Sequence, residues 1–197
     1  IICIGEALVD RLGPLGGNPA IDKPVQNCLG GAPANVSCGL AKLGTQAAFC
    51  GRLGVDEAGE EFRDLMNTRK VNLDGLQNDL DRPTRVVLVR RDLKGERVFQ
   101  GFAGDVGAGF ADQAFALTPL VDVWPLLISQ AKWLLTGTIP LASSTSAETL
   151  LWCIKSAFDK NIQIAVDINW RPTFWNVNYP PNAGPDKNSL EKIKPLV

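Results

Sequence analysis

The sequence predicts an α/β fold in which a parallel sheet is covered by helices on both faces, with a small separate β-sheet. Continuously apolar segments of strand length alternate along the chain with segments whose apolar residues recur at helical spacing. Continuously apolar strands are typical of parallel sheets that are buried on both faces, and their alternation with helices indicates βαβ units. A stretch from residue 84 to residue 102 breaks this alternation and predicts the separate β-sheet.

The first elements are a buried strand and a loop-rich stretch. Residues 1–4 are apolar and precede a glycine, which predicts a strand running into a polar loop at Gly5, Glu6 and Asp10. Residues 13–28 are rich in Gly, Pro and Asn, which favours a loop or an edge strand.

A helix is expected next, from Pro33 to Leu43. Val36, Leu40 and Leu43 form one apolar stripe along it, and the positions beside the stripe carry small residues. The stripe predicts the face that packs on the sheet.

The remaining elements follow the same alternation. The hairpin of the separate β-sheet is indicated by two β-rich runs on either side of Asp92-Leu93-Lys94-Gly95, which has the residues of a tight turn. Further strands are expected over residues 47–54, 131–139 and 162–170, and further helices over residues 57–68 and 145–160.

Composition narrows the function classes. Among 197 residues, 20 Lys and Arg against 21 Asp and Glu give a net charge of −1 without a basic or acidic run, which argues against nucleic acid or a membrane surface as partner. The chain contains no histidine, which excludes Ser-His-Asp and Cys-His mechanisms and His-ligated metals within it. Five cysteines without a C-x-x-C pair are expected to be reduced, and no apolar run approaches the ~20 residues of a membrane span, so a cytoplasmic location is expected.

The segment Gly30-Gly31-Ala32-Pro33-Ala34-Asn35 stands where the helix begins. Glycines let the backbone turn sharply and let a ligand approach bare peptide, while proline is tolerated in the first helical turn. The spacing is neither G-x-G-x-x-G nor G-x-x-x-x-G-K-[ST], which favours hydroxyl groups over a nucleotide phosphate as the ligand. The residues alone leave open a plain glycine turn that serves helix packing.

Four motifs occur in order along the chain: GEALVD at residues 5–10, GGAPAN at 30–35, G-x-x-G-x-D-x-x-G at 51–59 and DINWRP at 167–172. Together they resemble the PfkB (ribokinase-like) carbohydrate kinase family, and the first two are most similar to its fructokinase branch. The resemblance covers essentially the whole chain. It implies a ribokinase-like (Rossmann-like) parallel sheet with helices on both faces and a small β-sheet lid, with lid segments at about residues 11–28 and 82–104.

The resemblance also assigns roles to matched positions. Asp10 would accept hydrogen bonds from sugar hydroxyls, while Arg171 would steady a charged group. Two plainer roles stay open: a helix or loop cap for Asp10, and an ion pair that holds a loop in place for Arg171. The implied substrate-binding residues are Asp10, Gly30, Gly31, Asn35, Phe102, Gly137 and Arg171, and Asp167 and Asn169 are implied on the phosphate and nucleotide side.

The catalytic half of such a site is not expected in this sequence. The family's base is the aspartate of a Gly-Ala-Gly-Asp motif late in the chain, and the nearest match, Gly107-Ala108-Gly109-Phe110, lacks the aspartate and is read as a coincidental loop. No catalytic residue and no metal ligand are therefore expected here. Residues 1–197 are expected to be the N-terminal part of one kinase domain, without its ATP-binding part and inactive alone; both ends look cut.

The function implied is transfer of the γ-phosphoryl group of ATP to a sugar hydroxyl, with fructose as the favoured acceptor, Mg²⁺ as cofactor and a monovalent cation such as K⁺ as an open addition. Phe102 is followed by Ala103 and Gly104, not by arginine, which disfavours a sugar acid. The lid implies a homodimer contact, although an edge hairpin without a gating role stays open. Alternative functions are a kinase for ribose, another sugar or a nucleoside, and a non-catalytic relative that binds a sugar or a protein partner.

Overall fold

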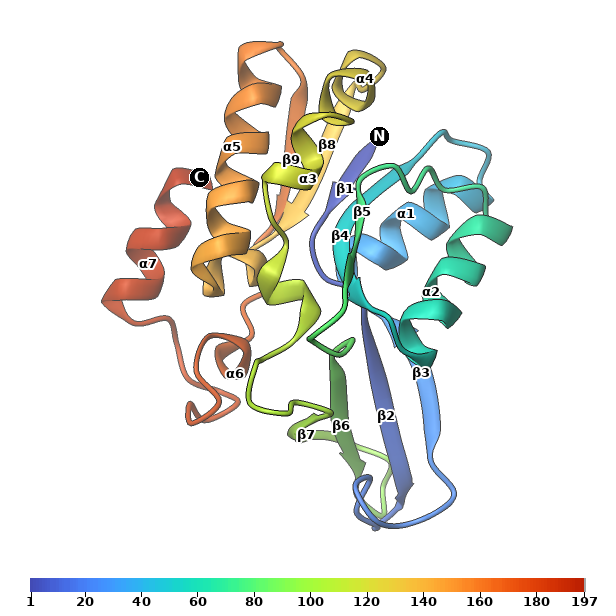
Figure 1. Cartoon of the computed structure of the whole chain (residues 1–197). Coiled ribbons are helices and arrows are strands. Elements are labelled where there is room, and N and C mark those ends of the chain that lie inside the picture. The colour runs from blue at the N-terminus through green and yellow to red at the C-terminus, as the bar shows by residue number, and fades with distance from the viewer. Residues whose placement is uncertain (197) are drawn as a thin grey trace.

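The computed structural model describes residues 1–196, and its centre is a five-stranded parallel sheet (Figure 1). The strand order is β5-β4-β1-β8-β9, and every neighbouring pair is parallel. The strands are β1 (Ile2–Ile4), β4 (Ala48–Gly54), β5 (Leu76–Asp79), β8 (Trp133–Gly137) and β9 (Gln163–Asp167). The predicted parallel α/β sheet is confirmed, and β5 is a strand that the sequence pattern did not indicate.

Helices cover both faces of this sheet, as predicted. The helices are α1 (Ala32–Lys42), α2 (Glu57–Thr68), α3 (Thr118–Val121), α4 (Trp124–Ser129), α5 (Ser144–Asp159), α6 (Pro172–Trp175) and α7 (Lys187–Ile193), with 3₁₀ turns η1 (Ala111–Ala114), η2 (Ile139–Ala142) and η3 (Lys194–Leu196). Residues of α1 and α2 pack in one apolar core, and residues of α3, α4, α5 and α7 pack in the other. Within residues 1–196, no helix combines the length and apolarity needed to cross a membrane.

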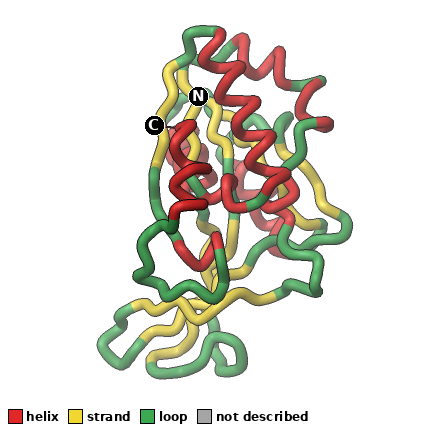
Figure 2. The backbone as a smooth tube through the Cα atoms, turned by 90° about the vertical axis from the view of Figure 1, so that its left-hand side faces the viewer, coloured by secondary structure: helices red, strands yellow, loops and turns green. Residues whose placement is uncertain are grey.

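A second, four-stranded sheet extends from one end of this body, and Figure 2 shows it as the group of strands at the lower end of the tube. We call it the small sheet. Its order is β3 (Gln26–Gly30), β2 (Leu8–Leu15), β6 (Val86–Arg91) and β7 (Arg97–Ala103). The β6–β7 hairpin is antiparallel, as predicted, whereas β2 and β6 pair in parallel.

Asp10 lies inside strand β2, so the expectation of a polar loop at this position is wrong. Strand β1 ends at Ile4, and the chain turns at Gly5, whose φ is 151° and whose N–H donates to the carbonyl of Cys50. It then enters the small sheet at Leu8. The pattern of apolar and polar residues hid this change of sheet because only three residues separate the two strands.

The buried face of α1 also differs from the predicted stripe. Leu43 is 82% exposed, and the buried residues of the helix are Pro33, Ala34 and Ser37. A Cβ added at Gly5 would lie 2.6 Å from Cγ of Pro33, so the helix packs too closely for large side chains at this point. Close approach of helix and strand, not the size of the apolar residues, selects the face.

Candidate active-site cleft

A cleft of about 580 Å³ lies between the small sheet and the body. It collects residues from strands β2, β6 and β7, from the start of α1, and from the segment after β9. The residues that line it are Glu6, Leu8, Asp10, Leu12, Gly31, Ala32, Asn35, Val87, Val89, Arg97, Phe99, Ile139, Asn169, Arg171, Pro172, Thr173, Phe174 and Pro181. Chain segments that are far apart in sequence thus form one concave surface.

Asp10 is the half-buried carboxylate of this cleft. Burial raises its pKa above the usual value, and the positive charges of Arg97 and Arg171 act in the opposite direction. A Cβ added at Gly30 would lie 3.2 Å from Oδ2 of Asp10, so the missing side chain leaves room for the carboxylate. A carboxylate placed in this way can accept two hydroxyl hydrogen bonds.

Gly31 and Asn35 lie at the start of α1 and line the same cleft as the β7 residues. Gly31 has φ 96°, and a Cβ there would lie 2.4 Å from the carbonyl oxygen of Glu6, so only glycine fits. The backbone N–H of Asn35 donates to the carbonyl of Gly31 over 2.9 Å. The side-chain amide of Asn35 takes no part in this bond, and the residue is exposed. The backbone of Gly31 and the amide of Asn35 therefore present donors and acceptors beside Asp10.

Asn169 and Arg171 enter the cleft from the segment that follows β9. The N–H of Asn169 donates to Oδ1 of Asp167 over 3.1 Å, so Asp167 caps this turn and is not among the lining residues. Arg171 precedes α6, and its Nη1 donates to the carbonyl of Trp170. Arg171 thus presents a guanidinium group whose bond is to the backbone and not to a carboxylate.

Four of the residues predicted from the sequence, Asp167 among them, are not among the residues that line the cleft. Gly137 pairs with Asp167 between β8 and β9, and Gly30 ends β3 beside Asp10. Phe102 packs on Phe99 and Phe174, each with ring centroids 5.1 Å apart. The cleft lining therefore brings together Asp10, Gly31, Asn35, Asn169 and Arg171, while Gly30, Phe102, Gly137 and Asp167 support it.

Two charged residues of the cleft were not predicted from the sequence to be site residues. Arg97 lines it from β7, and Glu6 lines it from the turn before β2. Glu6 is 3% exposed, and burial raises the pKa of its carboxyl to about 7. Glu6 stood inside the GEALVD motif, and a charged residue between two apolar segments was the signal that could have found it.

A buried ion pair joins the small sheet to the body behind the cleft. Nη2 of Arg85 lies 3.0 Å from Oδ2 of Asp112, and the two side chains are 3% and 6% exposed. The guanidinium also lies within 4.9 Å of the ring centroids of Phe102, Phe110 and Phe174. We call these five residues the aromatic-arginine cluster. Within it, the carboxylate of Asp112 is engaged in the ion pair with Arg85.

The Gly107–Phe110 segment forms a loop between β7 and η1. Oδ1 of Asp105 accepts hydrogen bonds from the N–H groups of Gly107 and Gly109, over 2.7 and 2.9 Å. These amides are therefore engaged by a side chain of the same loop and do not form an anion hole at a helix N-terminus. Within residues 1–196, no three Cys, Asp or Glu side chains are grouped so that they could hold a metal ion.

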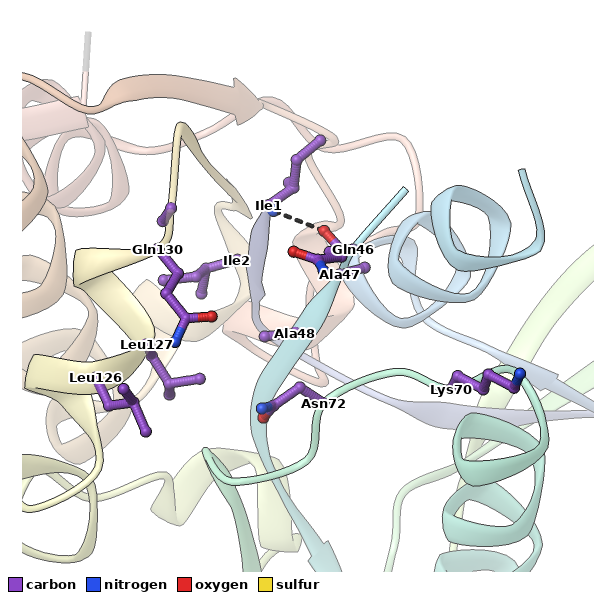
Figure 3. A pocket seen from close by; sticks show the side chains of 11 residues that line it. Ile1, Ile2, Gln46, Ala47, Ala48, Lys70, Asn72, Leu126, Leu127 and Gln130 are labelled. Atoms are coloured by element: carbon purple, nitrogen blue, oxygen red, sulfur yellow. Dashed lines mark hydrogen bonds between the residues drawn. The ribbon is translucent and has the colours of Figure 1, made fainter. Parts of the chain in front are cut away.

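A second cavity, of about 280 Å³, lies at the amino ends of β1 and β4 (Figure 3). The amino group of Ile1 donates to the carbonyl of Gln46 over 2.9 Å beside it. Its lining includes Leu126, Leu127 and Gln130 from α4, and Lys70 is its one charged side chain. Ligands of open α/β sheets bind at the carboxyl ends of the strands, so the cleft with Asp10 is the better candidate site.

Comparison with known families shows which family the chain belongs to. The model of the pfkB family of carbohydrate kinases matches residues 1–182. The chain belongs to the PfkB family. This PfkB chain has the ribokinase-like fold expected for the family, and the resemblance stated from its motifs is confirmed.

Similar proteins include several fructokinases. The PfkB chain is 30% identical to a probable chloroplastic fructokinase-6 of Arabidopsis thaliana, over 89% of this chain and 44% of the relative. It is 28% identical to a fructokinase of Salmonella typhimurium, over 87% of this chain and 51% of the relative. The chain thus spans about half the length of the curated relatives that it matches.

Solved structures with a similar fold also include fructokinases. A crystal structure of fructokinase from Xylella fastidiosa superposes with a TM-score of 0.79 at 29% identity, covering 98% of this chain and 57% of that one. A structure of fructokinase from the same organism with bound ATP gives a TM-score of 0.78, with the same coverage.

Proposed function

We propose that the full-length protein containing this PfkB chain is an ATP-dependent sugar kinase, with fructose as its acceptor. One observation carries the proposal: the carboxylate of Asp10 faces a cleft shared with the backbone of Gly31 and the amide of Asn35. The fructokinase names of several relatives support the acceptor, and the ATP-bound Xylella fastidiosa structure supports the phosphoryl donor.

In this mechanism the residues of the chain bind and orient the sugar. Asp10 accepts hydrogen bonds from two hydroxyls, and Gly31 and Asn35 hold other oxygens of the ring. Asn169 and Arg171 line the same cleft, and in this proposal they act on the side of the phosphoryl group. Gly30, Phe102, Gly137 and Asp167 act by supporting these groups.

The catalytic base, the nucleotide pocket and the ligands of Mg²⁺ belong, in this proposal, to a later part of the full-length protein. Mg²⁺ neutralises charge on the transferred phosphoryl group when it is bound, and K⁺ is a further candidate cofactor. We therefore expect residues 1–197, expressed alone, to show no turnover.

The small sheet is proposed to act as a lid, with segments at about residues 11–28 and 82–104. It lies over the cleft through β2, β6 and β7, and its closure would keep water away from the phosphoryl group. Its outer face is also the proposed contact of a homodimer.

A cytoplasmic location is proposed from the chemistry of the chain. Its five cysteines are free, and burial raises the pKa of Cys3 and Cys50 to about 12, so these thiols stay protonated. Free buried thiols are usual in a reducing compartment.

A second candidate function is phosphorylation of a sugar that carries an anionic group. Arg97 and Arg171 both line the cleft, and the charges of both act on Asp10. These two guanidinium groups weigh against the expectation, drawn from the absence of an arginine after Phe102, that a sugar acid is disfavoured.

The test is ADP release by the full-length protein with Mg-ATP and fructose, glucose, ribose, 2-keto-3-deoxygluconate or adenosine. We expect turnover on fructose, and an Asp10→Ala variant should bind fructose about 10- to 100-fold more weakly, the equivalent of one or two charge-assisted hydrogen bonds. Turnover on 2-keto-3-deoxygluconate alone would establish the second candidate instead. If the folded protein releases ADP with none of these substrates, a non-catalytic relative is favoured. If Asp10→Ala binds fructose as tightly as wild type, Asp10 is not part of the site.

A further inference from the structure

Glu6 is a buried acidic residue to which the proposed kinase mechanism gives no role. Its side chain is 3% exposed. Oε1 accepts a 3.1 Å hydrogen bond from the backbone N–H of Ala32, the first residue of α1. Oε2 is buried and has no hydrogen-bond partner among the described residues.

Helix α1 begins without a cap of its own. Its N-cap residue is Gly31, which has no side chain, and its first turn contains no acidic residue. The free N–H groups and the positive end of the dipole at a helix start favour a nearby carboxyl acceptor. Glu6 supplies that acceptor from a different segment of the chain.

Glu6 thereby connects the two segments that form the sugar side of the cleft. Along the chain it precedes strand β2, which carries Asp10, and through Ala32 it holds the first turn of α1, which carries Asn35. Gly31 packs against it as well, because a Cβ at Gly31 would meet the Glu6 carbonyl at 2.4 Å. Movement of Glu6 would shift Gly31 and Asn35 relative to Asp10.

The surroundings of Glu6 raise the pKa of its carboxyl to about 7. Besides the cleft, it lines a small cavity of about 10 Å³, which is about the least volume that holds a water molecule, together with Arg85, Asp112, Ser143 and Ser146. Burial is the largest cause of the rise, and hydrogen bonds with the backbone at Glu6 and Ala32 oppose it. Of the two nearby charges, Asp112 raises the pKa and Arg85 lowers it. A carboxamide of the same size would meet the same contacts without a charge.

We propose that Glu6 is a positioning residue of the sugar site, which caps α1 from a distance and fixes Gly31 and Asn35 relative to Asp10. The proposal rests on the proposed sugar-kinase function. Its cap is one accepted hydrogen bond, so glutamine can replace glutamate, whereas methionine, of similar size, cannot accept it.

The experiment compares wild type, Glu6→Gln and Glu6→Met in the full-length protein. Glu6→Met should raise the KM for fructose about 10-fold or more, which corresponds to the free energy of one hydrogen bond accepted by a carboxyl group. The KM for ATP should stay within about twofold of wild type. Glu6→Gln should stay within about threefold of wild type for both substrates. Ser146→Ala is the matched control, because Ser146 lines the same small cavity but donates to Pro140, away from α1, and its KM for fructose should be that of wild type.

A second measurement does not depend on turnover. Hydrogen exchange of the Ala32 amide should be about 10-fold faster in Glu6→Met than in wild type and unchanged in Glu6→Gln. If wild type phosphorylates no sugar, this readout still decides whether Glu6 caps α1, and only the proposed function fails.

Two results would overturn the proposal. Slow exchange of Ala32 in Glu6→Met, with an unchanged KM for fructose, would show that α1 and its residues keep their place without Glu6. A Glu6→Gln variant as impaired as Glu6→Met would show that the charge itself is needed. That result would indicate direct contact of Glu6 with the substrate and not positioning of α1.

Discussion

At Gly31, both the backbone conformation and the lack of space for a Cβ require glycine. Its φ of 96° and the 2.4 Å approach of a Cβ to the Glu6 carbonyl combine backbone strain with a contact to rigid backbone. Gly31→Ala should therefore destabilise the protein by about 1–3 kcal/mol or more. Gly39→Ala is the matched control in the same helix, where nothing lies within 4 Å of a Cβ, and it should stabilise by about 0.5–1 kcal/mol. Urea unfolding of both variants measures the difference; equal effects would contradict this account.

Glu6 also makes stability depend on pH. Its pKa rises from 4.5 to about 7 on folding, so between these values the folded state binds more protons than the unfolded state, and stability falls as pH rises. Below pH 4.5 both states are protonated, and above pH 7 the full cost of the buried charge is present, at most on the order of 3 kcal/mol.

Glu6→Gln removes this ionisation. Its melting temperature relative to wild type should be higher at pH 8 than at pH 5, as thermal unfolding at the two values would measure. A difference between variant and wild type that is the same at both pH values would contradict burial of an ionisable carboxyl at this position.

At the scale of elements, the aromatic-arginine cluster ties the small sheet to the body. Arg85 stands just before β6, Asp112 lies in η1, and their ion pair is almost fully buried. Removing one charge leaves the other buried without a partner, so Asp112→Asn should cost about 3–5 kcal/mol in urea unfolding.

An exposed pair provides the control for this prediction. Lys155 and Asp159, 2.9 Å apart on α5, have side chains that are 75% and 55% exposed. Asp159→Asn should cost less than about 1 kcal/mol. A similar cost for the two variants would mean that burial does not set the strength of the pair at Arg85.

The elements also show where sequence reasoning works. The bounds predicted for α2, residues 57–68, are those of the structure, where Asp56 is a local cap whose carboxylate accepts a hydrogen bond from the N–H of Gly59. The buried face of α1 was not predicted correctly, because its distance from the sheet depends on packing against residues that lie far away in sequence. Local chemistry fixes where a helix starts; distant packing fixes which side is buried.

For the whole molecule, the sequence predicted the parallel sheet, the helices on both faces and five of the residues that line the cleft. It missed Arg97 and Glu6. Arg97 reaches the cleft only because β2 pairs in parallel with β6, which in turn carries β7 beside it. That pairing joins segments more than seventy positions apart, and no local pattern specifies it.

The position of β1 at the centre of the main sheet has a consequence for how the chain acquires its structure. Strand β1 is made before both of its neighbours, β4 and β8, and the hydroxyl of Thr136 donates to the carbonyl of Ile4 across 132 positions of sequence. During synthesis the apolar residues of β1 must wait for partners that leave the ribosome much later. Such long-range contacts slow folding and lengthen the exposure of apolar strands. Nascent chains of this protein are therefore expected to depend on molecular chaperones until β8 has emerged.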